Sequence, residues 1–216
     1  MTLNLKDHTP NAIIFDWDNT LADTWPLIEA AMRQMLEEYG MQSYLEQYRS
    51  RTFGMPMREA FPLLFKDKAD QMLKSYVKHY HIQRDNNIIL NPYAKELILS
   101  AKNQGIPLFV VSNKLGESLR YEAKYINYDQ YFEAIIGSKD TEYDKPHRQP
   151  VDYALKDSNI ILDQNSWFIG DSEIDMHCAL NCNCTGILYG DSYKKTNRPM
   201  PESDQIIKIS SFEELL

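Results

Sequence analysis

Hydrophobic positions follow different patterns in different regions of this chain. A short apolar run over residues 12–17 ends in acidic residues, as expected at the end of a buried strand. From about residue 22 to residue 88, apolar residues recur at helical spacing in four successive segments, with no strand-like run between them. The pattern therefore predicts an all-helical block directly after the first strand. The predicted helices occupy about residues 24–39, 44–48, 56–65 and 67–84.

Residue types that favour helix starts stand at both junctions of this block. Asp23 or Thr24 can cap the first helix, and Pro26 suits its first turn. After the block, Asn91 as the N-cap and Pro92 at the first helical position predict a helix that ends at a glycine. Both junctions are therefore expected to lie next to helix ends.

Strand-like and helix-like segments alternate in the rest of the chain. The predicted strands lie at about 107–112, 132–137, 166–170, 185–189 and 205–209, and the helices near 115–126, 149–157, 174–181 and 211–216. Such alternation is typical of an α/β fold with a mostly parallel, Rossmann-like sheet. The strand at 12–17 must belong to this sheet, because a lone strand cannot bury its apolar faces. We therefore predict an α/β core of residues 1–21 and 89–216, with residues 22–88 as an inserted helical domain.

Two carboxylates, Asp16 and Asp18, follow the first predicted strand at a spacing of two. Side chains of a strand alternate between its faces, so both carboxylates can face one metal ion or one substrate. One can act as a nucleophile that forms an aspartyl-phosphate, while the other donates and accepts protons. Like charges this close favour a divalent cation such as Mg²⁺. A solvated loop is the alternative, whereas a calcium loop is excluded because Leu21 and Leu27 occupy its Gly and Glu positions.

Polar residues also follow three later predicted strands. Ser112 and Asn113 stand between a strand and a helix, where a hydroxyl, an amide and helical N–H groups form an anion-binding corner. Lys145 lies in the loop after the next strand, and Asp171 and Asp175 follow the one after that. With the acidic pair, these residues supply what phosphoryl transfer requires: a nucleophile, a general acid, phosphate ligands and carboxylates for Mg²⁺. Each group alone is common, so the prediction depends on their combination.

With these motifs, the sequence resembles the haloacid dehalogenase superfamily of phosphotransferases over nearly its whole length. The superfamily's D-x-D-x-T corresponds to residues 16–20, its strand ending in Ser or Thr to 110–114, its Lys-Pro to 145–146 and its G-D-x-x-x-D to 170–175. The resemblance implies that Asp16 is the nucleophile and Asp18 the general acid and base. It also implies that Ser112 and Lys145 bind the phosphate group, with Asn113 beside them.

The resemblance further implies a Mg²⁺ ion and a mobile cap. The carboxylates of Asp16 and Asp171 and the main-chain oxygen of Asp18 would hold the ion, with Asp175 in or near its second coordination shell. Residues 22–88 would form the helical cap that closes over the site and selects the substrate. Within the superfamily, the sequence looks most like relatives of phosphoglycolate phosphatase.

Three positions depart from the superfamily's usual pattern. Trp17 is bulkier than the usual Phe or Leu, and Trp25 stands at the entrance to the cap, where smaller residues are common. Asn183, between Cys182 and Cys184, replaces the usual Ala-Gly turn. Asn tolerates a left-handed conformation, so the turn can persist. Trp25 bears on the choice of substrate rather than on the chemistry.

The sequence thus predicts a Mg²⁺-dependent phosphatase that hydrolyses a small soluble phosphomonoester, with 2-phosphoglycolate as one candidate. Two alternatives stay open. A sugar phosphomutase of the beta-phosphoglucomutase type would use cap residues such as Arg51 or Arg58 to hold a second phosphate. A non-catalytic binding protein could keep the same fold. The charged cap residues are each expected to be solvated helix charges; they are Arg49, Arg51, Arg58, Lys78, His79 and His81.

Composition restricts the remaining possibilities. With 23 basic and 31 acidic residues the formal net charge is -8, which argues against nucleic acid as a partner. No stretch approaches the roughly 18 apolar residues of a membrane span, so we predict a cytoplasmic protein without membrane contacts. A monomer and a homodimer are both compatible with the sequence. Cys178, Cys182 and Cys184 are an odd number and crowded together, unlike a disulfide framework. As a zinc site they lack a fourth ligand other than His177, so buried small residues are the expected interpretation.

Overall fold

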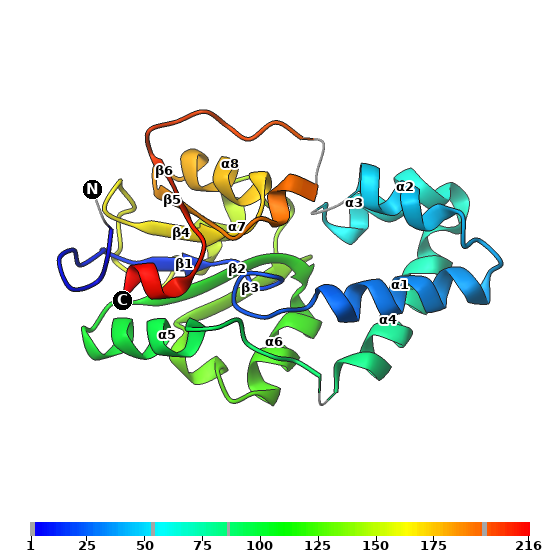
Figure 1. Cartoon of the computed structure of the whole chain (residues 1–216), viewed down its shortest axis with the longest axis horizontal. Coiled ribbons are helices and arrows are strands. Elements are labelled where there is room, and N and C mark those ends of the chain that lie inside the picture. Colours follow the sequence, from blue (N-terminus) through cyan, green and yellow to red (C-terminus); the bar gives the residue numbers. More distant parts are fainter. Residues whose placement is uncertain (1–2, 53–54, 86, 196–197) are drawn as a thin grey trace.

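A parallel sheet forms the centre of the larger part of the molecule (Figure 1). The computed structural model describes residues 3–52, 55–85, 87–195 and 198–216. Six strands lie in the order β3-β2-β1-β4-β5-β6, so the first strand of the chain is central. Their bounds are β1 Ile13–Phe15, β2 Leu108–Leu115, β3 Ala134–Ser138, β4 Trp167–Gly170, β5 Thr185–Tyr189 and β6 Ile206–Ile209. Every pairing is parallel, which confirms the predicted α/β fold.

Helices cover both faces of the sheet. They are α5 Ala94–Asn103, α6 Gly116–Tyr125, α7 Gln149–Ala154 and α8 Glu173–Asn181, with the short 3-10 helices η2 Asp129–Tyr131, η3 Ser192–Lys195 and η4 Phe212–Leu215. Alternate residues of β1 enter two different cores: Ile13 and Phe15 pack with α5, α6 and η4, whereas Ile14 packs with α7 and α8. This alternation explains why the strand is apolar at every position, because both of its faces are buried.

The helical block packs around a core of its own at one end of the molecule (Figure 1). It consists of α1 Trp25–Glu38, α2 Tyr44–Arg51, α3 Met57–Phe65, η1 Lys66–Lys68 and α4 Ala69–Arg84. Met32, Met35, Phe61 and Met72 are fully or almost fully buried there. The methionine and aromatic stripes of these helices therefore form a separate hydrophobic core.

The two chain segments that join the block to the sheet lie side by side. The main-chain N–H of Asp23 donates to the carbonyl of Ile89 at 2.9 Å, and that of Asn91 donates to the carbonyl of Leu21 at 2.8 Å. Both segments therefore leave the sheet region next to the loop that follows β1, where the acidic pair lies. The block is attached beside the candidate site.

Two predicted helix starts differ from the structure at these junctions. Helix α5 begins at Ala94, after Tyr93 with a positive φ of 63°, and not at Pro92. The Asn91 amide instead donates to the main-chain oxygens of residues 19 and 20 at 3.2 and 2.7 Å. These hydrogen bonds tie the junction to the loop after β1, so the amide does not cap the helix. Thr24 does precede α1, but its hydroxyl donates to the carboxylate of Asp18 at 2.6 Å and does not cap the helix.

The remaining elements lie close to their predicted positions. The segment predicted as a C-terminal helix over 211–216 is the short 3-10 helix η4, and α7 ends at Ala154 instead of residue 157. Asn183 has a positive φ of 61°, as predicted for the turn before β5. Among the described residues, no helix is long and apolar enough to cross a membrane.

Candidate active site

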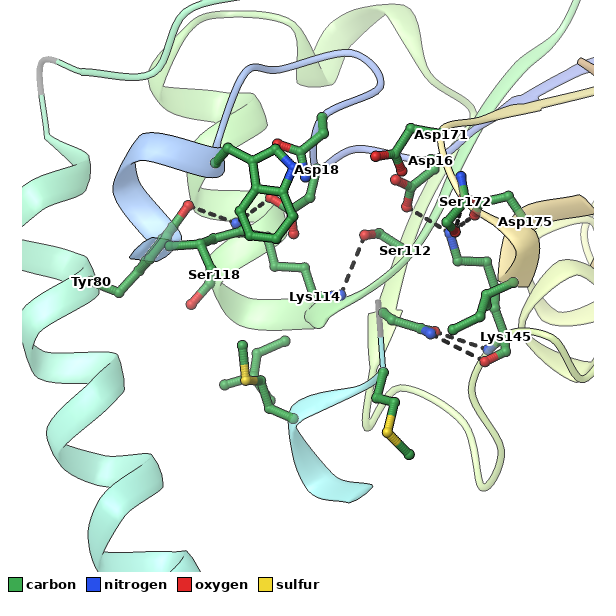
Figure 2. Close-up of a pocket in the computed structure, with 18 of the residues that line it drawn as sticks. Asp16, Asp18, Tyr80, Ser112, Lys114, Ser118, Lys145, Asp171, Ser172 and Asp175 are labelled. Carbon is green, nitrogen blue, oxygen red and sulfur yellow. Dashed lines mark hydrogen bonds and ion pairs between the residues drawn. The ribbon is translucent and has the colours of Figure 1, made fainter. Parts of the chain in front are cut away.

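The carboxyl ends of the central strands and the inner face of the helical block enclose a pocket (Figure 2). Its volume is about 110 Å³. From the sheet side it is lined by Asp16, Asp18, Asn19, Ser112, Asn113, Lys114, Leu115, Ser118, Lys145, Asp171, Ser172, Ile174 and Asp175. All the site residues predicted from the sequence therefore meet in one place, because parallel strands end at the same edge of the sheet.

A buried lysine connects two of the acidic residues. The Lys145 Nζ lies 2.6 Å from Asp16 Oδ1 and 2.6 Å from Asp175 Oδ1, and all three side chains are buried. Asp175 also accepts hydrogen bonds from the main-chain N–H and the hydroxyl of Ser172, at 3.1 and 2.6 Å. These contacts hold Asp175 at the start of α8. A side chain at Gly170 would overlap the Asp175 carboxylate, which explains the glycine that ends β4.

Strand β2 continues to Leu115, so Ser112 and Asn113 lie inside the strand near its end and not after it as predicted, and Ser112 places a hydroxyl beside these groups. The Ser112 side chain is buried, and its oxygen accepts a hydrogen bond from the main-chain N–H of Lys114 at 3.3 Å. The Asn113 amide donates to the main-chain oxygen of Lys145 at 3.1 Å, and its oxygen accepts from the Lys145 N–H at 3.0 Å. Asn113 thus holds the loop of Lys145 in place, in addition to lining the pocket.

Three carboxylates are close enough to share one cation. Asp16, Asp171 and Asp175 each offer an oxygen, and these oxygens lie within 4.8 Å of one another. Burial, opposed by Lys145 and reinforced by the neighbouring carboxylates, raises the pKa of Asp16 to about 6. Burial and the charges of Asp175 and Asp16 likewise raise the pKa of Asp171. One lysine does not balance three buried acids, so the cluster suits a hard divalent cation with oxygen ligands, such as Mg²⁺.

The carboxylate of Asp18 lies apart from this cluster, on the other side of the pocket (Figure 2). Its Oδ1 accepts hydrogen bonds from Thr24 at 2.6 Å and from the Lys114 Nζ at 2.8 Å. The side chain is about one-fifth exposed, at 21%. Asp16 and Asp18 therefore have different partners, which is how two neighbouring carboxylates can take different roles.

Sequence reasoning missed a buried polar network behind Asp18. The Lys114 Nζ also contacts Glu122 Oε1 at 3.1 Å and the Tyr80 hydroxyl at 2.7 Å. Glu122 is fully buried, and its second oxygen accepts a hydrogen bond from the Trp17 indole at 2.8 Å. Burial raises the pKa of the Glu122 carboxyl, against the influence of Lys114. The only signal in the sequence was the position of Lys114 directly after Ser112 and Asn113.

Among the described residues, the three cysteines and His177 are not grouped at metal-binding spacing. Cys178, Cys182 and Cys184 are buried and free, whereas His177 is exposed. Within the described ranges, the acidic cluster is the single group with metal-binding spacing. The cysteines belong to the hydrophobic core on the α7 and α8 side of the sheet.

Two of the charged cap residues named from the sequence, Arg49 and His79, pair with acids of the helical block and do not line the pocket. Arg49 contacts Glu29 at 2.7 Å and His79 contacts Glu38 at 2.7 Å. The side chain of Arg51 lies outside the described part of the structure. Arg58, the second residue that the mutase alternative could use to hold a phosphate, is paired with Asp144.

Arg58 links the helical block to the loop that carries Lys145. Its Nε lies 2.6 Å from Asp144 Oδ2, and the Asp144 side chain is only 2% exposed. Asp144 also accepts a hydrogen bond from the Ser138 hydroxyl at 2.9 Å. Burial raises the pKa of Asp144, although Ser138 and Arg58 oppose this shift. The contact therefore braces the block against the sheet, one residue from the phosphate-binding candidate Lys145.

Replacing Arg58 with Ala is expected to lower the free energy of unfolding by about 1–3 kcal/mol, because it leaves a buried carboxylate without its cation. The measurement is chemical denaturation of Arg58→Ala, Asp144→Asn and the double variant. The two single effects should not add in the double variant, since both remove one interaction. Arg49→Ala is the matched control, and loss of its exposed ion pair should change stability by less than about 1 kcal/mol. Equal effects of the two arginine variants would contradict the brace.

Comparisons with known proteins show the family and the fold of the chain. The family model described as haloacid dehalogenase-like hydrolase matches residues 13–188. The pyrophosphatase PpaX of Oceanobacillus iheyensis is 26% identical over 185 residues, which cover 86% of this chain and 86% of PpaX. A HAD-superfamily hydrolase from Ehrlichia chaffeensis has 30% identity and a TM-score of 0.64 over 96% of this chain and 94% of its own. A predicted phosphoglycolate phosphatase from Haemophilus somnus, at 21% identity, shares the fold with a TM-score of 0.74 over 89% and 90%.

Proposed function

The chain belongs to the haloacid dehalogenase-like hydrolases and is a phosphatase, and from this premise we propose that it hydrolyses a small phosphomonoester with Mg²⁺ through an aspartyl-phosphate. The observation that carries the proposal is the position of Asp16. It stands at the end of the central strand, buried, 2.6 Å from Lys145 and within the acidic cluster. A carboxylate that is fixed, desolvated and next to a cation is suited to in-line attack on phosphorus.

Asp16 and Asp18 divide the chemistry between them. A carboxylate oxygen of Asp16 forms a bond to phosphorus while the bond from phosphorus to the leaving oxygen breaks, and Asp18 gives that oxygen a proton. In the second step Asp18 takes a proton from water. The water oxygen then bonds to phosphorus, the bond to Asp16 breaks and inorganic phosphate leaves. The contacts of Asp18 with Thr24 and Lys114 orient it for both transfers.

The phosphate oxygens are bound by groups on the strand ends. Lys145 supplies a positive charge, and the Ser112 hydroxyl supplies a hydrogen bond, both from buried positions. Asn113 fixes the Lys145 loop through two hydrogen bonds to its main chain and also lines the pocket. These donors would stabilise the negative charge that increases on the phosphate oxygens during transfer.

Mg²⁺ is the cofactor that the acidic cluster fits. The carboxylates of Asp16 and Asp171 and the main-chain oxygen of Asp18 would hold it. Asp175 would lie beside the ion rather than on it, because both of its oxygens already accept hydrogen bonds from Lys145 and Ser172. When bound, the ion would neutralise charge on the phosphate and on the attacking carboxylate.

Residues 22–88 act as a cap over a core formed by residues 1–21 and 89–216. The two paired connections at Leu21–Asp23 and Ile89–Asn91 are the hinge candidates, because the block joins the sheet there. The cap's contribution to the pocket is mainly apolar, which lets it exclude water during the first transfer. A second function, phosphomutase, has less support because Arg58 is bonded to Asp144.

The test is release of inorganic phosphate from a panel of phosphomonoesters and pyrophosphate, with and without Mg²⁺. We expect release that requires Mg²⁺. The panel includes 2-phosphoglycolate and pyrophosphate because relatives and fold neighbours carry those names. A folded protein that releases phosphate from none of them would overturn the proposal. A protein that returns the phosphoryl group to a sugar phosphate without releasing it would be a mutase.

A further inference from the structure

The half of the pocket away from the acidic cluster is formed by apolar and aromatic side chains of the helical block. These are Trp25, Ile28, Tyr48, Met55, Met57, Tyr76, Val77 and Tyr80. Among the described side chains of the block, no lysine, arginine or histidine lines the pocket. This is the surface that a leaving group would touch while its phosphate lies at the strand ends.

Among the described residues that line the pocket, the two lysines already contact acids. Lys145 lies between Asp16 and Asp175, at 2.6 Å from each. Lys114 contacts Asp18 at 2.8 Å and Glu122 at 3.1 Å. A second anionic group on the substrate would therefore enter a half-pocket in which the described side chains offer no spare cation, next to several carboxylates. Placing an unpaired charge in such surroundings is strongly unfavourable.

Among the described side chains of the block that line the pocket, the polar groups are the phenol hydroxyls of three tyrosines and the indole N–H of Trp25. Tyr48, Tyr76 and Tyr80 are buried, and burial raises the pKa of each hydroxyl, so all three keep their protons. Tyr76 and Tyr80 stack with their ring centroids 5.9 Å apart. Neutral hydroxyls and flat rings suit contacts with an uncharged ring, by stacking and by hydrogen bonds to its oxygen atoms. The cavity of about 110 Å³ is smaller than the roughly 300–1,000 Å³ of sites for drug-sized ligands, which favours a single ring.

We propose that this phosphatase acts on phosphomonoesters of uncharged, ring-containing alcohols, and that it discriminates against leaving groups that carry a carboxylate or a second phosphate. The inference rests on the proposed phosphatase function and concerns its substrate class. The proposed substrates differ from those that the names of the pyrophosphatase and the phosphoglycolate phosphatase suggest. Pyrophosphate and 2-phosphoglycolate each carry a second anionic group.

A pair of substrates of equal shape tests the inference. The kcat/KM for phosphate release is measured with 4-carbamoylbenzyl phosphate and with 4-carboxybenzyl phosphate, which differ in charge and hardly in size. Benzyl phosphate, 2-phosphoglycolate and pyrophosphate are measured beside them. We expect the neutral member of the pair to be preferred at least about tenfold, since the charged one leaves its carboxylate unpaired. Equal rates, or preference for the anionic substrates, would overturn the inference and leave the phosphatase intact. Release from no substrate would overturn both.

A charge introduced into the half-pocket should reverse the preference. Val77 is half-buried and lines the pocket from α4, so Val77→Lys would place an ammonium group near the leaving group. Val77→Met is the matched control, with a side chain of similar length and no charge. The lysine variant should raise the ratio of carboxylate to carboxamide turnover at least about tenfold relative to the methionine variant. An unchanged ratio in a folded variant would contradict the proposed contact. The same kcat/KM values are measured for Arg51→Ala. If the wild type prefers the anionic substrates and Arg51→Ala loses this preference, the inference is overturned.

Discussion

Replacing Asp16 with Asn is expected to abolish phosphate release while leaving the protein folded. The amide cannot form the covalent bond to phosphorus, so kcat should fall by about four orders of magnitude or more, as for loss of other covalent nucleophiles. The measurement is Mg²⁺-dependent phosphate release, with circular dichroism and thermal unfolding of the same samples. Turnover that persists in a folded variant would remove Asp16 from the nucleophile's role.

We also expect Asp16→Asn to change how the free energy of unfolding of the metal-free protein depends on pH. Asp16 has a folded-state pKa of about 6, raised mainly by burial from an ordinary value of 3.8. The folded protein therefore binds more protons than the unfolded chain between these two values, and its stability falls as pH rises through them. Asn at this position does not titrate and removes one charge from the acidic cluster. Metal-free Asp16→Asn should therefore lose less stability than the wild type between about pH 4 and pH 6.

An exposed acid provides the control for that comparison. Asp157 is exposed and does not line the pocket. Asp157→Asn should keep the wild-type pH profile and the wild-type activity, because it leaves the buried acidic cluster and the pocket unchanged. A pH profile of Asp16→Asn that matches the control would mean that Asp16 does not titrate as its burial indicates.

The positions of Asp16, Ser112, Lys145 and Asp171 could be predicted from the sequence because each lies near the end of a buried strand or in the loop after it. Strands of this kind are read from continuous apolar runs, and their carboxyl ends share one edge of the sheet. The strand order itself did not have to be known. Any parallel arrangement with the first strand near the centre brings these groups together.

Glu122 could not be predicted in the same way. It lies within helix α6, where a glutamate is usually solvated, and its burial results from packing against Trp17 and Lys114. Similarly, Arg58 and Asp144 are distant in sequence, and each looks like an ordinary surface charge. Long-range pairing of charges has no periodic signature, so only the three-dimensional arrangement reveals it.

Local rules failed where tertiary contacts outweighed them. Asn91 has the sequence signature of a helix cap, yet its amide binds the β1 loop, and α5 starts only after Tyr93 adopts a left-handed conformation. Thr24 likewise gives its hydroxyl to Asp18 instead of to the helix. Both exceptions lie at the junctions of the helical block. The hydrogen bonds of these residues hold the loop that carries Asp16 and Asp18. These tertiary contacts outweigh the preference of the two residues for capping a helix.

Replacing Lys145 with Met should damage both activity and stability. The lysine is the cation between Asp16 and Asp175, and although burial disfavours its charge, these carboxylates raise its pKa. Without it, phosphate loses its buried positive ligand, and kcat/KM should fall by about 10³-fold or more. The buried acids also lose their partner, which should lower the free energy of unfolding by about 3–5 kcal/mol near pH 8 without metal.

The stability loss in Lys145→Met should depend on pH and on Mg²⁺ in defined directions. Without the lysine, which lowers the pKa of Asp16, the folded-state pKa of Asp16 moves further upward, so the folded protein holds a proton that the unfolded chain has released. Stability is then lost as pH rises, and the variant should approach the wild type at about pH 4 to 5, where the carboxylates are protonated. Mg²⁺ should restore part of the stability near pH 8, because it binds the folded cluster preferentially.

Lys139 provides the matched control, because it is an exposed lysine a few residues earlier in the same loop. Lys139→Met removes the same charge from the chain but leaves the contacts of Lys145 with Asp16 and Asp175 intact. It should retain activity and stability at every pH. If Lys139→Met instead abolished turnover while Lys145→Met did not, the phosphate cation would be Lys139. The buried Lys145 would then serve only to neutralise the acidic cluster.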